Sequence, residues 1–159
     1  MTIGPGDRIP DVTVHVMGEK GPEAVSSASL FAGRKVVMFG LPGAFTPTCS
    51  AAHLPGYVVK ADEFFSRGVD SIICISVNDA FVMDAWGKAQ NAENVLMVAD
   101  GAAALTRAMG LDVDMTERGF GVRSERYAMI VEDGVVKLLN REAPRKFEVS
   151  DADTILAAL

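Results

Sequence analysis

Apolar residues follow two patterns along the chain: alternation in one segment and continuous runs in three others. Residues 12–17 alternate valine with other side chains, which predicts an early strand with one buried face. Residues 36–40, 69–77 and 95–99 are almost uninterrupted apolar runs. Short runs of this kind are typical of strands covered on both faces. The pattern therefore predicts one half-buried strand and three fully buried ones.

Helical spacing or capping signals follow these strands at several places. Residues 54–65 carry apolar side chains at helical spacing. Asn78 or Asp79 offers an N-cap to a second helix, and residues 102–109 predict a short third helix ended by a glycine. Residues 150–153 resemble a capping box that opens a last helix. Helices are thus expected between the strands and at the end of the chain.

The last strands are expected to form a hairpin. Residues 127–131 and 135–139 flank Asp133-Gly134, a pair that tolerates the positive φ of a type I′ turn. Residues 111–125 have mixed periodicity and are expected to form an exposed loop with a possible turn of helix. Strands separated by helices, followed by a hairpin, predict an α/β domain spanning residues 1–159, with a central mixed sheet flanked by helices on both faces. This order is similar to that of the thioredoxin-like fold.

Composition and charge narrow the possible functions. The chain has 15 basic and 21 acidic residues, a formal charge of -6 and a pI near 4.9, which disfavours binding to nucleic acid. The first ten residues lack a signal-peptide pattern, and no stretch reaches the roughly 18 apolar residues of a membrane span. We therefore expect a cytoplasmic protein that binds no membrane. With two histidines, no metal or other cofactor is expected.

Two cysteines, Cys49 and Cys74, raise the question of a reactive thiol rather than a disulfide scaffold. Thr46 is a plausible N-cap and Pro47 suits the first helical position, so Cys49 falls in the first turn of a helix. Unpaired backbone N–H groups and the helix dipole favour the ionised thiolate there. The alternative is that Cys49 is only a small buried apolar residue. Pro55 predicts a kink or restart, which would make the turn holding Cys49 a separately movable piece.

A family pattern runs through this segment. Pro42-x-x-x-Thr46-x-x-Cys49 resembles the peroxiredoxins, and the fuller string of residues 42–50 is similar to their type II, peroxiredoxin-5-like branch. The similarity continues, in family order, through His53-Leu54-Pro55-Gly56, Ser76-Val77-Asn78-Asp79-Ala80-Phe81-Val82, Trp86 and Arg123-Ser124-x-Arg126-Tyr127.

The resemblance implies a thioredoxin-like fold and a thiol-dependent peroxidase that uses no cofactor and forms a homodimer. It implies that Cys49 is the peroxidatic cysteine, that Thr46 and Arg126 activate the thiolate and the peroxide, and that Pro42 shields the sulfur. Donors are needed because the attacked peroxide must expel hydroxide or alkoxide as charge leaves the sulfur. Hydrogen peroxide and small alkyl hydroperoxides are the expected substrates.

For several other residues the sequence leaves alternative roles or locations open. Without the motif, Arg118 and Arg123 would compete equally with Arg126 for the catalytic role. His53 lies four residues after Cys49 and is expected to be packed or solvated rather than a base. Trp86 is expected in the core or an interface, and Phe45 at either the substrate entrance or the core. Exposed apolar residues in the segment 41–45 and around Phe81 are the expected dimer contacts.

The sulfenic acid left on Cys49 must be reduced by another sulfur. Many type II members carry a resolving cysteine near the chain end, but residues 147–150 contain none here. Cys74 is placed like the second cysteine of plant-like type II members, yet isoleucines surround it, so a core role is favoured over a resolving one. We therefore expect an external thiol, either glutathione with glutaredoxin or thioredoxin. The alternatives are a peroxide-sensing switch or holdase and, disfavoured by the absence of Cys-x-x-Cys, protein thiol–disulfide exchange.

Overall fold

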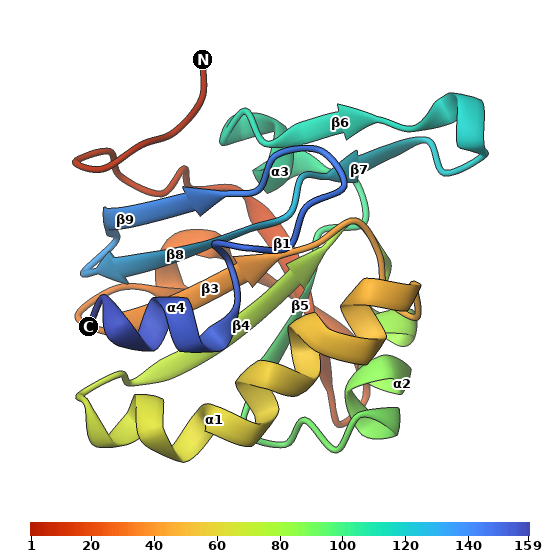
Figure 1. Ribbon diagram of the computed structural model, residues 1–159. Coiled ribbons are helices and arrows are strands. Elements are labelled where there is room, and N and C mark those ends of the chain that lie inside the picture. The colour runs from red at the N-terminus through yellow and green to blue at the C-terminus, as the bar shows by residue number, and fades with distance from the viewer.

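A seven-stranded sheet forms the centre of the computed structural model, which describes residues 1–159 (Figure 1). The strand order is β2-β1-β5-β4-β3-β8-β9. The strands β3, β4 and β5 run parallel to one another, and the remaining pairs are antiparallel. The bounds are β1 Thr13–Gly18, β2 Gly21–Ser26, β3 Lys35–Gly40, β4 Ser71–Ser76, β5 Leu96–Ala99, β8 Tyr127–Glu132 and β9 Val135–Arg141.

Helices cover both faces of this sheet, as expected, and the mixed thioredoxin-like architecture is confirmed. The helices α1 (Leu54–Ser66), α2 (Ala80–Ala89) and α4 (Ala152–Ala157) pack into one apolar cluster with one face. The short helix α3 (Ala104–Ala108) and the N-terminal segment pack into a second cluster on the other face. None of the helices combines the length and apolarity that a membrane-spanning segment requires.

The predicted elements with strong signals are present. The three apolar runs form β3, β4 and β5, and Asp79 caps α2 by accepting a hydrogen bond from the Val82 N–H at 2.9 Å. Asp133 and Gly134 both adopt positive φ, 48° and 78°, in the turn between β8 and β9. Each of these elements is determined by residues close together in the sequence, so the sequence pattern was enough to predict it.

Two expectations about secondary structure were wrong, and one strand was not predicted. The unpredicted strand is β2, which pairs with β1 and whose exposed edge position tolerates Pro22. The segment 111–125 contains a two-stranded sheet, β6 (Asp112–Asp114) and β7 (Val122–Ser124), around the 3-10 turn η3 (Thr116–Arg118). The last helix is capped by Asp151, whose carboxylate accepts from the Thr154 N–H at 3.2 Å, because the Ser150 hydroxyl is bonded elsewhere.

The helix beginning at Pro47 does not restart at Pro55. Instead, a π-helical segment, η2 (Cys49–His53), joins α1 directly, and the Leu54 N–H donates to the Cys49 carbonyl five residues earlier. Since Pro55 has no N–H, widening this turn accommodates the missing donor without breaking the helix. Cys49 is therefore part of a continuous helical segment rather than a separate piece.

Candidate active site

The loop between β3 and η2 brings Cys49 to the carboxyl end of the parallel strands. Asn78 holds this loop, because its side-chain oxygen accepts from the Ala44 N–H at 3.0 Å and from the Ser76 hydroxyl at 2.8 Å. The Ser76 hydroxyl also lies 3.2 Å from the Leu41 carbonyl oxygen. Residues at the end of β4 and just after it thus hold the loop that leads to Cys49.

Cys49 is fully buried, and a guanidinium lies beside its sulfur. The Arg126 Nη2 group donates to the Cys49 Sγ at 3.2 Å. Arg126 lies between β7 and β8, 77 positions along the chain from Cys49. Of the three arginines that the sequence left in competition, it is the one bonded to the sulfur. Arg123 instead donates to the Pro42 carbonyl at 3.3 Å, and the exposed Arg118 lies over the Phe120 ring.

His53 holds the other branch of the Arg126 guanidinium. The Arg126 Nη1 group lies 2.9 Å from the His53 Nδ1, and the His53 Nε2 lies 3.1 Å from the Ser150 carbonyl oxygen. Since the guanidinium only donates and a carbonyl only accepts, the imidazole must be neutral with its proton on Nε2. Burial, and secondarily the charge of Arg126, lower the pKa of His53 to about 3.

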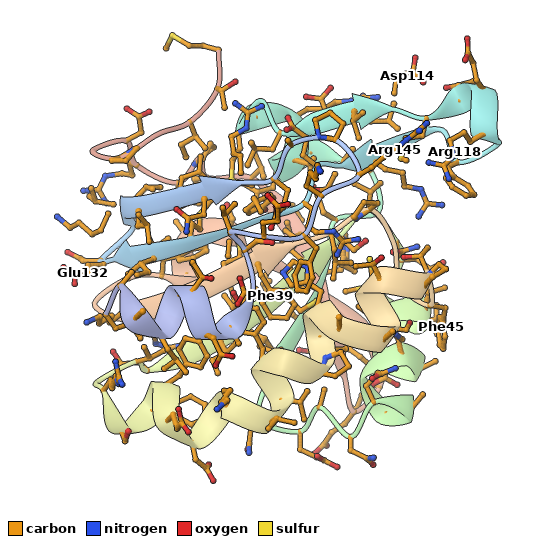
Figure 2. All side chains as sticks on the ribbon, in the orientation of Figure 1. Phe39, Phe45, Asp114, Arg118, Glu132 and Arg145 are labelled. Atoms are coloured by element: carbon orange, nitrogen blue, oxygen red, sulfur yellow. The ribbon has the colours of Figure 1, made fainter.

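Three aromatic rings enclose this imidazole. The Phe39, Tyr57 and Phe147 ring centroids lie 4.9, 5.8 and 5.0 Å from that of His53. Figure 2 shows Phe39 inside the molecule, between the sheet and the helices. The Tyr57 hydroxyl donates to the Ser150 carbonyl at 2.7 Å, so that carbonyl serves both side chains. His53, which the sequence left without a catalytic assignment, therefore belongs to the support of the site.

Thr46 does not cap the helix with its side chain as expected. Its hydroxyl donates to the Gly43 carbonyl at 2.7 Å, and only its backbone carbonyl accepts from the helix, from the Ser50 N–H at 2.9 Å. With its proton committed to Gly43, the Thr46 oxygen is available as an acceptor. Such an oxygen suits the O–H of a hydroperoxide. Pro42 is half-buried at the start of the same loop.

Cys74 is buried in β4, opposite Phe39 of β3 in the sheet register. Burial, with a smaller contribution from Cys49, raises the pKa of the Cys74 thiol well above its usual value. Both cysteines are free thiols. A protonated thiol inside the sheet is a poor nucleophile, which fits the expected core role.

Two aromatic residues flank the cysteine turn. Trp86 is fully buried, and its indole N–H donates to the Ser50 hydroxyl at 3.0 Å, which ties α2 to the residue after Cys49. Phe45 is 55% exposed with φ of 63°, and Figure 2 shows it at the outer edge of the molecule. Trp86 is thus a core residue, whereas Phe45 lies at the surface near the site.

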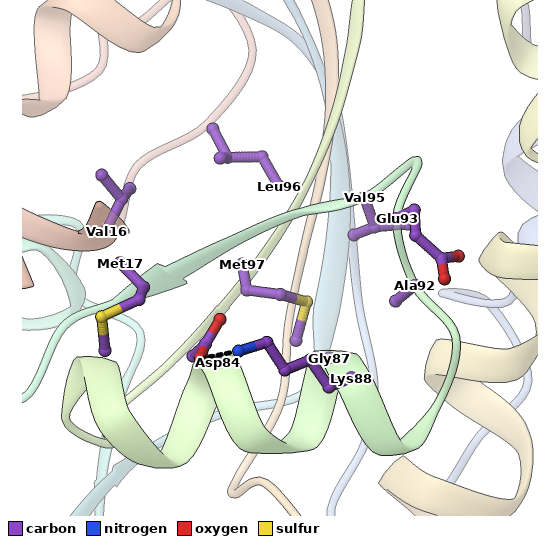
Figure 3. Close-up of a pocket in the computed structure, with 10 residues that line it drawn as sticks. All are labelled: Val16, Met17, Asp84, Gly87, Lys88, Ala92, Glu93, Val95, Leu96 and Met97. Carbon is purple, nitrogen blue, oxygen red and sulfur yellow. Dashed lines mark ion pairs between the residues drawn. The ribbon is translucent and has the colours of Figure 1, made fainter. Parts of the chain in front are cut away.

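A hollow of about 230 Å³ lies away from this site, against α2, β1 and β5 (Figure 3). Met17, Gly87 and Met97 line it together with the ion pair between Lys88 and Asp84, whose charged atoms are 2.9 Å apart. None of the candidate site residues predicted from the sequence lines it. No group of three or more His, Cys, Asp or Glu side chains is arranged to hold a metal ion.

Comparisons with known proteins agree on one family. The family described as Redoxin matches residues 4–156. Peroxiredoxin-2B of Arabidopsis thaliana is 49% identical over 159 residues, which cover 99% of this chain and 98% of that protein. The structure of reduced Prx3 from Vibrio vulnificus in complex with hydrogen peroxide is 56% identical, with a TM-score of 0.96 over 99% of each chain. Peroxiredoxin 5 from Alvinella pompejana is 34% identical, with a TM-score of 0.87 over 98% of this chain and 97% of that one.

Proposed function

This chain belongs to the type II branch of the peroxiredoxins, a family of thiol peroxidases, and on that premise we propose that it reduces hydrogen peroxide and small alkyl hydroperoxides through Cys49. The observation that carries the proposal is the hydrogen bond from Arg126 to the Cys49 sulfur. This guanidinium gives the sulfur a charge-assisted hydrogen bond and places an N–H donor where peroxide oxygens must approach.

In the proposed reaction, the Cys49 thiolate attacks one peroxide oxygen, so that an S–O bond forms as the O–O bond breaks. The other oxygen leaves as hydroxide or alkoxide and takes up a proton, and the sulfur remains as a sulfenic acid. Arg126 donates to the oxygens as negative charge moves onto them, and Thr46 accepts from the hydroperoxide O–H. Pro42 shields the sulfur from solvent.

We propose that an external thiol, either glutathione with glutaredoxin or thioredoxin, resets the enzyme. The sulfenic acid and the first thiol condense to a mixed disulfide and water, and a second thiol then releases Cys49. Cys74 lies in a central strand between β3 and β5 and shares the apolar cluster of Cys49, so a disulfide between these two buried sulfurs would require a local rearrangement of the chain.

Steady-state peroxide consumption with each reductant tests this proposal. Wild type and Cys74→Ser should turn over equally with the preferred reductant. Collapse of turnover in folded Cys74→Ser would show instead that Cys74 resolves the sulfenic acid. Consumption of a single equivalent of peroxide, with either reductant in excess, would favour a peroxide-sensing switch or holdase over an enzyme.

We also propose a homodimer and a cytoplasmic location. Phe45 and Phe81 are 55% and 65% exposed, and large exposed apolar side chains are typical of contact surfaces. Within the segment 41–45, Leu41 is fully buried, so Phe45 is the large apolar side chain that the segment exposes. The cytoplasm keeps glutathione and thioredoxin reduced. Sedimentation of wild type and Phe81→Ser would test the dimer, which should dissociate more readily in the variant.

A further inference from the structure

A closed ring of hydrogen bonds joins Arg126 to a carboxylate that the reaction does not use. The Glu142 backbone N–H donates to the Arg126 carbonyl at 3.0 Å. The Glu142 side chain binds Ser150, the Ser150 carbonyl binds His53, and His53 binds the Arg126 guanidinium. Arg126 is therefore held through both its backbone and its side chain by way of one residue, Glu142.

The Glu142 carboxylate is well satisfied although it has no cationic partner. It accepts from the backbone N–H groups of Glu148, Val149 and Ser150 at 2.8 to 2.9 Å and from the Ser150 hydroxyl at 2.7 Å. Glu142 is buried, with only 8% of the residue's surface exposed. Burial alone would raise the pKa of Glu142, but these hydrogen bonds outweigh it and lower the pKa below its ordinary value. Consecutive N–H groups directed at one anion fix the path of the chain.

This carboxylate fixes the loop of residues 143–151 between β9 and α4, which packs directly on the active site. The centroids of the Phe147 and His53 rings are 5.0 Å apart. The Arg126 guanidinium carbon lies over the Phe147 ring, 5.8 Å from its centroid. The Asn140 side chain adds a hydrogen bond of 2.8 Å to the Val149 carbonyl. Movement of this loop would displace both the ring and the carbonyl that orient the guanidinium.

We propose that Glu142 is a positioning residue of the peroxidase site. It holds the β9–α4 loop, so that His53 keeps the Arg126 guanidinium within hydrogen-bond distance of the Cys49 sulfur. The inference rests on the proposed function, because it concerns how well Arg126 serves the peroxide. Glu142 touches neither the sulfur nor the substrate, so it acts only through Ser150 and His53.

The test compares two reactions of Cys49 in Glu142→Gln and Glu142→Ala. Reduction of hydrogen peroxide depends on the placement of Arg126, whereas alkylation by iodoacetamide depends on the thiolate but needs no donor to a leaving oxygen. Trp86, bonded to Ser50 beside Cys49, is the single tryptophan of the chain and provides a fluorescence signal. We expect the peroxide rate constant to fall roughly 10- to 100-fold in Glu142→Ala and less in Glu142→Gln. Alkylation should change much less.

A matched control is Glu132→Gln at the far end of the β8–β9 hairpin, where Glu132 is exposed and pairs with Lys35 at 3.9 Å (Figure 2). It should leave both rates unchanged. If Glu142→Ala does not fold, Glu142→Gln and Ser150→Ala carry the test. An unchanged peroxide rate, or equal falls in the two rates, would overturn the positioning role.

Nitrogen NMR of the His53 ring gives a second readout that does not require peroxidase activity. Wild type should show a single neutral tautomer protonated on Nε2, and Glu142→Ala should show a mixture of tautomers. An unaltered His53 spectrum in the folded variant would contradict the proposal that Glu142 orients His53 through Ser150. Failure of the wild type to turn over peroxide would instead refute the proposed function, so the two failures are distinguishable.

Discussion

Acidification should destabilise this protein through His53. The folded state holds the imidazole neutral, with the pKa lowered to about 3 by burial and by Arg126, against an ordinary value of 6.5. Between these values the unfolded chain binds a proton that the folded protein rejects. Stability contributed by the neutral imidazole is therefore complete above about pH 6.5 and is lost progressively as the pH falls.

The size of this effect follows from the pKa shift. A shift from 6.5 to about 3 corresponds to about 5 kcal/mol if the whole range is titrated. About 2 kcal/mol of this is lost between about pH 7 and pH 5. Glu142, whose pKa is also lowered, loses its contribution only as the pH falls below the ordinary carboxylate range, so the two effects separate.

Urea unfolding of wild type and His53→Gln at the two pH values measures the effect. Glutamine carries an amide that can donate toward Ser150 but does not titrate. Wild type should lose about 2 kcal/mol more unfolding free energy than the variant on acidification. His15, the other histidine, is present in both proteins and cancels. Equal losses in the two proteins would refute the assignment of a buried neutral imidazole beside Arg126.

Three further substitutions test individual contacts. Arg126→Lys should lower the peroxide rate constant about 100-fold in stopped-flow assays, because a single ammonium cannot serve both the sulfur and the imidazole; a wild-type rate would contradict this. Trp86→Phe should cost about 1 kcal/mol in urea unfolding by removing the hydrogen bond to Ser50, and no cost would mean that this bond contributes nothing. Gly40→Ala would place a Cβ against the Tyr127 ring and should lower the unfolding free energy in urea by about 1–3 kcal/mol, and an unchanged value would contradict the close packing at this position.

Much of the fold was predictable because its signals are local. Apolar runs identified the central strands, and Asp133-Gly134 identified the last hairpin. The strand β2 was missed because it is mostly exposed and contains proline, and β6 and β7 were missed because each has only three residues. Short, exposed strands depend on pairing that the sequence pattern does not display.

The candidate site was predictable only in part, because some of its contacts join residues far apart in the sequence. Cys49 followed from its place at a helix start, and Arg126 followed from the family pattern alone. The support of Arg126 was missed because it depends on long-range contacts: His53 meets Arg126 across 73 positions and Ser150 across 97. A histidine four residues after a cysteine, in a helix containing proline, carries no local sign of these partners.

The most direct test of the central claim is rapid mixing of hydrogen peroxide with reduced wild type, Cys49→Ser and Cys74→Ser, followed by trapping of sulfenic acid and mass spectrometry. Wild type and Cys74→Ser should each consume one equivalent of peroxide and carry the trap on Cys49. Cys49→Ser should consume none and carry no trap. Peroxide consumption by folded Cys49→Ser at the wild-type rate would contradict the assignment of Cys49 as the peroxidatic cysteine.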